Sequence, residues 1–90
     1  MEFEWDPKKA DSNKQKHDVT FQEGATVFGD SLAITFADPD HSEDEERYIT
    51  FGLSTQKRLL VVSHADRGDK TRIISARLMT NKERKIYEEG

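Results

Sequence analysis

Two histidines and three arginines in this sequence are the side chains whose types could together cleave a phosphodiester. Histidine accepts or donates a proton near neutral pH, and arginine binds phosphate oxygens through two parallel N–H donors. Attack of a ribose 2′-hydroxyl on the adjacent phosphate requires proton transfer and cations that stabilise the charge building on the phosphate. This chemistry requires no metal and no cofactor, so none is expected. The candidate catalytic residues are His17, His64, Arg67, Arg72 and Arg77.

Arg72 and Arg77 bracket the run RIISAR, which otherwise has the pattern of a buried strand. Side chains alternate along a strand, so residues five apart are expected to point to opposite faces. Arg67 lies in the preceding turn, close to His64 at the end of the strand before it. His64, Arg67 and Arg72 could thus converge at one end of the sheet, and Arg77 is expected at the other end, beside a C-terminal helix. Reach from neighbouring elements and the twist of the sheet could still bring Arg77 toward a shared concave face, and this alternative stays open. The ordinary alternatives are a surface histidine and arginines that pair with nearby acids.

The charge is distributed unevenly along the chain, although the net charge is only −4. Residues 1–56 contain 5 Lys or Arg and 13 Asp or Glu, a balance of −8. Residues 57–86 contain 9 Lys or Arg and 3 Asp or Glu, a balance of +6. Glu88 and Glu89 then bring the total to −4. The basic part of the chain indicates an anionic partner, or it balances the charge of the acidic part within the fold. Both interpretations stay open.

The length of 90 residues allows one domain, residues 1–90, with a small core. The absence of cysteine excludes a disulfide scaffold, a thiolate metal site and a cysteine nucleophile. No apolar run approaches the ~20 residues of a membrane span, and the N-terminus MEFEWDPKK does not have the pattern of a signal peptide. A cytoplasmic protein without a membrane partner is expected. The phosphate-loop, dinucleotide-binding, zinc-protease and serine-hydrolase motifs are also missing.

Three helices are predicted from their capping signals. The pair Asp6–Pro7 begins a helix that runs to about His17, because Asp caps a helix and Pro suits its first position. The capping-box motif T-x-x-E begins two more helices, at Thr20 and at Thr80. The first of these ends at Gly29, and the second runs to the C-terminus.

The first predicted helix has Ala10 as its only clear apolar residue, although a short helix normally docks through an apolar stripe. One interpretation is a solvated helix that is held by its flanks, with Phe3 and Trp5 as anchors. The other is that Lys9, Lys16 and His17, which fall roughly on one helix face, form part of a site. In that interpretation Lys9, Lys16 and Trp5 bind RNA.

Four strands follow from period-two alternation and from a continuous apolar run that indicates a central strand. Short connections between them favour an antiparallel meander. The expected fold class is α+β, in the order ααββββα: a four-stranded antiparallel sheet with two N-terminal helices and one C-terminal helix. The predicted strands are residues 32–37, 47–54, 58–64 and 71–77.

The segment DPDHSEDEE between the first two predicted strands combines His41 with the consecutive acids Glu43 to Glu46. Such a cluster could bind a divalent cation. Consecutive carboxylates repel one another, however, and nothing in the segment fixes a coordination geometry. We therefore expect a solvated loop and no metal site.

Four stretches of the sequence together resemble the BrnT family of toxins from bacterial type II toxin–antitoxin systems. The resemblance extends from Phe3 to about Glu89, nearly the whole chain. The family pattern usually has glycine after the K-H pair, where this chain has Asp18. The stretches are F-x-W-D at Phe3–Asp6, K-x-x-x-N-x-x-K-H at Lys9–His17, the helix around Phe21–Phe28, and R-I-I-S-A-R at Arg72–Arg77.

The resemblance implies a RelE-like fold and a ribonuclease that stops translation by cutting RNA. It also implies an antitoxin partner, BrnA, with a ribbon-helix-helix DNA-binding part, which neutralises the toxin. The complex would repress its own operon, so operator DNA is contacted only through the antitoxin. The alternative is a noncatalytic subunit that binds the antitoxin and tunes repression.

Overall fold

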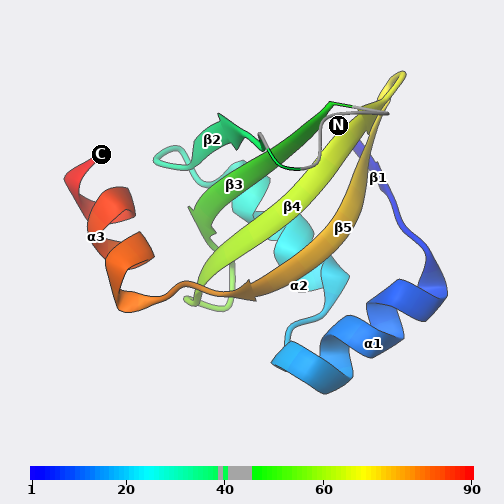
Figure 1. The fold of residues 1–90 in the computed structure, drawn as a ribbon, viewed down its shortest axis with the longest axis horizontal. Helices are drawn as coiled ribbons and strands as arrows, with labels where there is room; N and C mark the ends of the chain where they lie inside the picture. Colours follow the sequence, from blue (N-terminus) through cyan, green and yellow to red (C-terminus); the bar gives the residue numbers. More distant parts are fainter. Residues whose placement is uncertain (39, 41–45) are drawn as a thin grey trace.

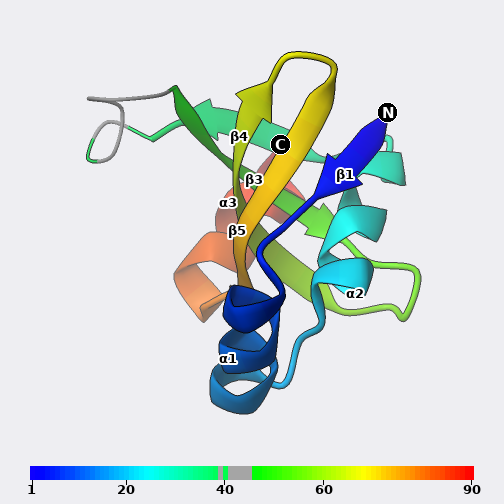
Figure 2. The ribbon, with the colours of Figure 1, turned by 90° about the vertical axis from the view of Figure 1, so that its right-hand side faces the viewer.

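The computed structural model describes residues 1–38, 40 and 46–90, and it places helices on both faces of one sheet (Figures 1 and 2). The acidic cluster considered as a metal site falls at residues 41–45 and Glu46, so most of it lies outside the described residues. In chain order the elements are β1 (Glu2–Glu4), α1 (Pro7–His17), α2 (Phe21–Ala25), the 3₁₀ turn η1 (Thr26–Gly29), β2 (Ile34–Ala37), β3 (Arg47–Leu53), β4 (Leu59–Arg67), β5 (Lys70–Leu78) and α3 (Asn81–Glu89).

The three predicted helices are present, and each begins at its predicted cap. The Asp6 carboxylate accepts a hydrogen bond from the backbone of Lys8, and the hydroxyls of Thr20 and Thr80 cap α2 and α3 in the same way. α1 ends at His17, and Asp18, which caps it, has a φ of 56° in the left-handed region. Glycine adopts this conformation without strain, which explains why glycine suits this position.

The sheet contains five strands in the order β1-β5-β4-β3-β2, so the prediction of a four-stranded, wholly antiparallel sheet is wrong. The four predicted strands do pair antiparallel in sequence order. The additional strand β1 pairs in parallel with β5, with Phe3 opposite Thr71, and the element order becomes βααββββα. Three residues are too few to show a periodic pattern, and β1 obtains its partner only from the distant β5.

α1 docks on β5 through a polar clamp instead of an apolar stripe. The buried Asn13 donates from Nδ2 to the carbonyl oxygens of Val19 at 2.9 Å and Ala76 at 2.7 Å, and its Oδ1 accepts from the Ala76 nitrogen at 3.1 Å. The amide thereby satisfies the backbone groups that a neighbouring strand would otherwise satisfy at this edge of β5. Trp5 and Ala10 pack against the adjacent core, so the helix is indeed held partly by its flank.

Successive side chains of β4 belong to two different cores, because they alternate across the sheet. Val62 packs beneath α2, and Val61 packs with residues near α3; we call these sides the α2 face and the α3 face. Figure 2 shows the two helices on opposite sides of the sheet. The α2 face buries Val19, Phe21, Val27, Leu60, Val62, Ile73 and Ala76, and the α3 face buries Phe51, Val61 and Met79.

Two polar contacts attach α3 to the rest of the protein, one to β5 and one to the residue that follows η1. Arg77 donates to both carboxylate oxygens of Glu83, each at 2.8 Å, and this guanidinium lowers the pKa of Glu83 to about 2. The Tyr87 hydroxyl donates to Asp30 at 2.6 Å, which raises the pKa of Tyr87 to about 12. Tyr87 also packs against the core of the α3 face, whereas Ile86 is 44% exposed.

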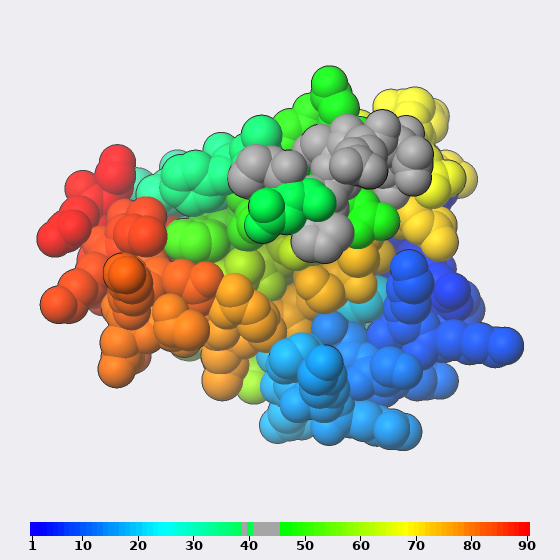
Figure 3. All heavy atoms as spheres, in the orientation of Figure 1, coloured from blue at the N-terminus to red at the C-terminus, as the bar shows by residue number. Residues whose placement is uncertain are grey.

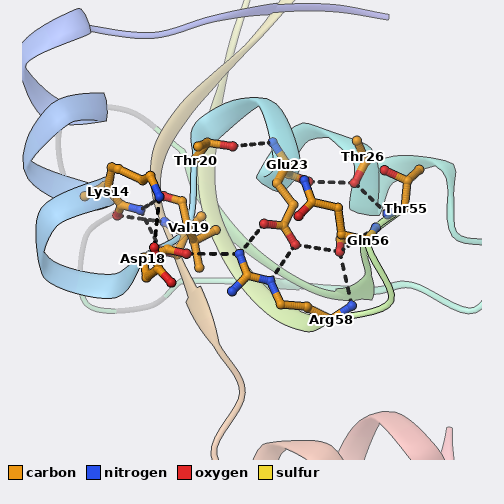
Figure 4. Close-up of polar contacts among 12 residues, drawn as sticks. Lys14, Asp18, Val19, Thr20, Glu23, Thr26, Thr55, Gln56 and Arg58 are labelled. Carbon is orange, nitrogen blue, oxygen red and sulfur yellow. Dashed lines mark hydrogen bonds and ion pairs between the residues drawn. The ribbon is translucent and has the colours of Figure 1, made fainter.

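A buried carboxylate connects α2 to the hairpin between β3 and β4 (Figure 4). The Glu23 side chain, 1% exposed, is ion-paired with Arg58 and accepts from the Ser54 hydroxyl at 2.7 Å. Arg58 also donates to the Asp18 carbonyl at 3.0 Å, so it reaches the end of α1. The guanidinium lowers the pKa of Glu23, and the carboxylate stays charged despite its burial.

Replacing Arg58 with alanine should lower the free energy of unfolding by about 2–4 kcal/mol, because it leaves the Glu23 carboxylate buried without its partner. Urea unfolding at pH 7 measures the change, and Lys85→Ala on the exposed side of α3 is the control, with an expected change within about 0.5 kcal/mol. Because Arg58 lowers the pKa of Glu23 below 4.5, the difference between wild type and Arg58→Ala should shrink as the pH falls below that value. Equal stability of both proteins at pH 7 would rule out this role.

Candidate active site

A β-bulge in β5 brings Arg72 and Arg77 to the same face of the sheet, which corrects the prediction that they point to opposite faces. Arg72 lies opposite Ala65 and Arg77 opposite Val61, and those two β4 residues are four apart. β5 spans the same distance with five residues, because the register shifts at the bulge and Ile74 is the extra residue. Both arginines therefore project from the α3 face.

The α3 face of the β4–β5 hairpin carries a row of cationic side chains. Arg67 and Lys70 are paired opposite each other near the turn, and Arg72 and Arg77 follow along β5. Ser75 lies between the two arginines on this face, opposite Ser63. We call the cationic residues the basic stripe, which consists of Arg67, Lys70, Arg72 and Arg77.

The two arginines of RIISAR each bind an acid from a flanking element. Arg72 pairs with Glu4 of β1 at 3.1 Å, and both side chains are about one third exposed or less. Arg77 binds Glu83 of α3, and the carboxylate raises the pKa of Arg77 further. Nearby acids thus balance their charge in the free protein, as the ordinary interpretation expected. An anionic ligand can use the same guanidinium groups only by competing with these carboxylates or by binding beside them.

A pocket of about 340 Å³ separates α1 from β5, directly beside the bulge. It brings together three predicted site residues, Lys9, Lys16 and His17, which all project from α1. On the β5 side it is lined by Ile74 and Ser75, which lie between Arg72 and Arg77 along the strand, although neither arginine lines the pocket. In Figure 3 α1 (blue) and β5 (orange) lie side by side on the face toward the viewer. The complete lining is Lys8, Lys9, Ser12, Asn13, Lys16, His17, Ile74 and Ser75.

The chemistry of this α1–β5 pocket suits a phosphate group. The described residues that line it include three lysines and no carboxylate. Lysine ammonium groups attract the phosphate as point charges, and the hydroxyls of Ser12 and Ser75 are further donors. His17, which is half-buried, supplies an imidazole suited to proton transfer. Among the described residues, the pocket therefore combines anion binding with a potential acid or base.

His64 does not join this site, and the predicted convergence of His64 with Arg67 and Arg72 is wrong. His64 lies opposite Ile73 on the α2 face and is 5% exposed, whereas the arginines project from the α3 face. Its Nε2 is 2.7 Å from the Thr50 hydroxyl, and its ring meets Phe28 edge-on. Its Nδ1 has no hydrogen-bond partner among the described residues. Burial lowers the pKa of His64, so the ring is neutral at pH 7.

Stability should fall as the pH drops from 7 to 5, in part because of His64. Protonation of its buried ring favours the unfolded chain, where the pKa of histidine is about 6.5, so the loss begins near that pH. The glutamine of His64→Gln cannot take up this proton, so the stability of the variant should depend less on pH over this range. The difference between the slopes of the two proteins should be at most about 1.4 kcal/mol per pH unit. Urea unfolding at pH 7, 6 and 5 measures both slopes, and equal slopes would contradict this account.

Trp5 also lies apart from the α1–β5 pocket. It packs edge-on against Phe21 with ring centroids 6.0 Å apart, and it belongs to the periphery of the α2-face core. Conversely, Lys8, Ser12 and Ser75 line the pocket although sequence reasoning did not select them. Lys8 and Ser12 lie eight and four residues before Lys16, respectively, a helical spacing that could have revealed them.

Among residues 1–38, 40 and 46–90, no group of His, Asp or Glu side chains is arranged to hold a metal ion. The helices in these parts of the chain are too short and too polar to span a lipid bilayer.

Comparison with known proteins identifies relatives of the chain. Among curated proteins, no sequence matches it significantly. The fold is similar to that of the Brucella abortus ribonuclease toxin BrnT, with a TM-score of 0.67 and 19% identity, covering 90% of this chain and 99% of that chain. A family model described as the ribonuclease toxin BrnT of type II toxin–antitoxin systems matches residues 5–83. The chain therefore belongs to the BrnT family of ribonuclease toxins.

Proposed function

We propose that this chain is an endoribonuclease toxin that cuts RNA without a metal ion, by attack of the ribose 2′-hydroxyl on the adjacent phosphate, and thereby stops translation. Membership of a ribonuclease toxin family supports the activity. The observation that carries the mechanism is the bulge at Ile74. It places Arg72 and Arg77 on one face of the sheet, beside the pocket that His17 lines.

In this mechanism each group has a chemical task. His17 is the side chain suited to proton transfer, and the lysine ammonium groups are the other proton donors of the pocket. Lys9 and Lys16 hold the RNA backbone, and the arginines of the basic stripe stabilise the charge that builds on the scissile phosphate. His64 and Trp5 have no task in cleavage, because the one is buried and the other packs against the core.

The proposal includes a BrnA-like antitoxin, since the family belongs to type II systems, in which a protein partner neutralises the toxin. In this proposal the toxin–antitoxin complex represses its own operon, and the antitoxin makes the contact with operator DNA. A net charge of −4 is consistent with DNA contacts that the antitoxin makes and the toxin does not, because strong binding to duplex DNA needs many cationic side chains.

One observation favours a second candidate, a noncatalytic subunit that only binds the antitoxin. Arg72 and Arg77 are already paired with Glu4 and Glu83 in the free protein. In a degenerate toxin these pairs would be purely structural, and the remaining function would be to hold the antitoxin and tune repression.

The test is cleavage of single-stranded RNA by the purified chain in the presence of EDTA. The proposal expects cleavage under these conditions and products that carry 2′,3′-cyclic phosphates. A substrate with a 2′-deoxy nucleotide at the cut site should stay intact, because it lacks the attacking hydroxyl. Cleavage that EDTA abolishes would contradict metal independence. Absence of cleavage together with intact antitoxin binding would favour the noncatalytic subunit.

A further inference from the structure

A second basic groove lies on the molecule, between the start of β4, the end of β5 and α3. It encloses about 250 Å³ and is lined by Lys57, Arg58, Leu59, Leu78, Met79 and Arg84. The described residues that line it are three cationic and three apolar side chains, with no carboxylate among them. No residue of this groove lines the α1–β5 pocket, so the two can be altered independently.

The apolar floor distinguishes this groove from the proposed RNA site. Leu78 is 49% exposed, and Leu59 is half-buried beside Met79. In the α1–β5 pocket, by contrast, Ile74 is the one large apolar side chain of the described lining. An apolar floor with a cationic rim fits a peptide that carries one apolar anchor and flanking carboxylates better than it fits a phosphodiester.

The backbone at Lys57 is an independent indication that the charged rim has a function. Lys57 has a φ of 68°, in the left-handed region where glycine is favoured and where a residue with a side chain is strained. The hairpin between β3 and β4 therefore carries a lysine at a position that glycine would occupy with less strain. Its side chain is exposed at the rim of the groove.

We infer that this groove binds an acidic amphipathic segment of the antitoxin. Carboxylates of that segment would lie beside Lys57 and Arg84, and an apolar side chain would fill the floor formed by Leu59, Leu78 and Met79. Arg58 contributes less, because it is engaged with Glu23. This inference rests on the proposed function only in that the partner is the antitoxin of this toxin.

Lys57→Gly tests the inference without disturbing the fold. The variant should be as stable as the wild type or slightly more stable, because glycine relieves the strained φ. Its affinity for the purified antitoxin encoded beside the toxin should fall roughly 3- to 10-fold, measured by calorimetry. The double variant Lys57→Glu, Arg84→Glu should lose more than tenfold, since each rim charge then repels the partner. Lys85→Glu, an exposed change on the same helix outside the groove, is the matched control and should bind normally.

RNA cleavage by the same variants separates the possible outcomes. We expect them to cleave RNA at the wild-type rate while the antitoxin inhibits them less. Normal antitoxin affinity in both variants would overturn the inference, as would a loss of RNA cleavage with antitoxin binding retained, because the groove would then serve RNA. If the wild type itself does not cleave RNA, the proposed function fails, and the affinity measurements still decide whether the groove binds the antitoxin.

Discussion

Replacing His17 with alanine is expected to lower the rate of RNA cleavage by about 10²-fold or more, the usual loss when a general acid or base is removed. His17 lines the α1–β5 pocket beside three lysines, and it is the one imidazole there among the described residues. The thermal midpoint should change little, because the half-buried His17 ring has no hydrogen bond that stabilises the fold among the described residues. Single-turnover cleavage and thermal melts measure both quantities.

Lys14→Ala is the matched control for substitutions in the pocket. Lys14 lies on the same helix and carries the same charge as Lys16, but it pairs with Asp18 at 2.9 Å and does not line the pocket. Cleavage should therefore drop in Lys16→Ala and persist in Lys14→Ala. If both lysine variants lose activity equally, the pocket contributes only through the general charge of the helix. Full activity of His17→Ala would exclude His17 from the chemistry.

The second large effect is expected at the arginines of RIISAR, and their acidic partners provide the control. Arg77→Ala and Arg72→Ala should each lower cleavage by roughly 10- to 100-fold, which corresponds to about 1.4–2.8 kcal/mol of lost transition-state stabilisation. The lysine variants should recover little, because an ammonium does not reproduce the guanidinium fork. Stability should fall by at most about 1 kcal/mol for Arg72, whose pair with Glu4 is partly exposed.

Glu4→Gln and Glu83→Gln remove the same ion pairs and leave the arginines in place. If an arginine only supports the fold, its alanine variant and the glutamine variant of its partner should affect cleavage alike. If it binds phosphate, the glutamine variant should retain or increase cleavage, because the guanidinium no longer has a competing carboxylate. Equal losses of cleavage in Arg77→Ala and Glu83→Gln would therefore contradict a role of Arg77 in phosphate binding.

The helices and four of the strands could be predicted because their signals are local. Asp6, Thr20 and Thr80 cap their helices as the sequence indicated, and the alternation between apolar and polar residues marks the antiparallel strands. β1 could not be predicted, since Glu2–Glu4 gains its structure only from pairing with β5. The Glu23–Arg58 pair was also hidden, because 35 residues separate its members and both belong to ordinary surface residue types.

The candidate site was predictable on α1 and not on the sheet. Helical spacing alone groups Lys9, Lys16 and His17, and the structure does place them along one pocket. The faces of Arg72 and Arg77 depend on a bulge, and nothing in RIISAR distinguishes Ile74 as its extra residue. For His64 the sequence does contain a signal, because strict alternation places it on the same face as the buried Leu60 and Val62.

The extra residue at the bulge also bears on which change in the length of the gene the site could tolerate. Loss of the Ile74 codon would restore strict alternation along β5 while every charged residue remained in the sequence. If the Asn13 clamp kept Ala76 in its place, the two arginines would be four residues apart, and Arg72 would stay on the α3 face opposite Ala65. A relative with one residue fewer between its two arginines would therefore present both on one face of a regular strand, whereas a chain with the spacing of RIISAR needs the bulge to do so.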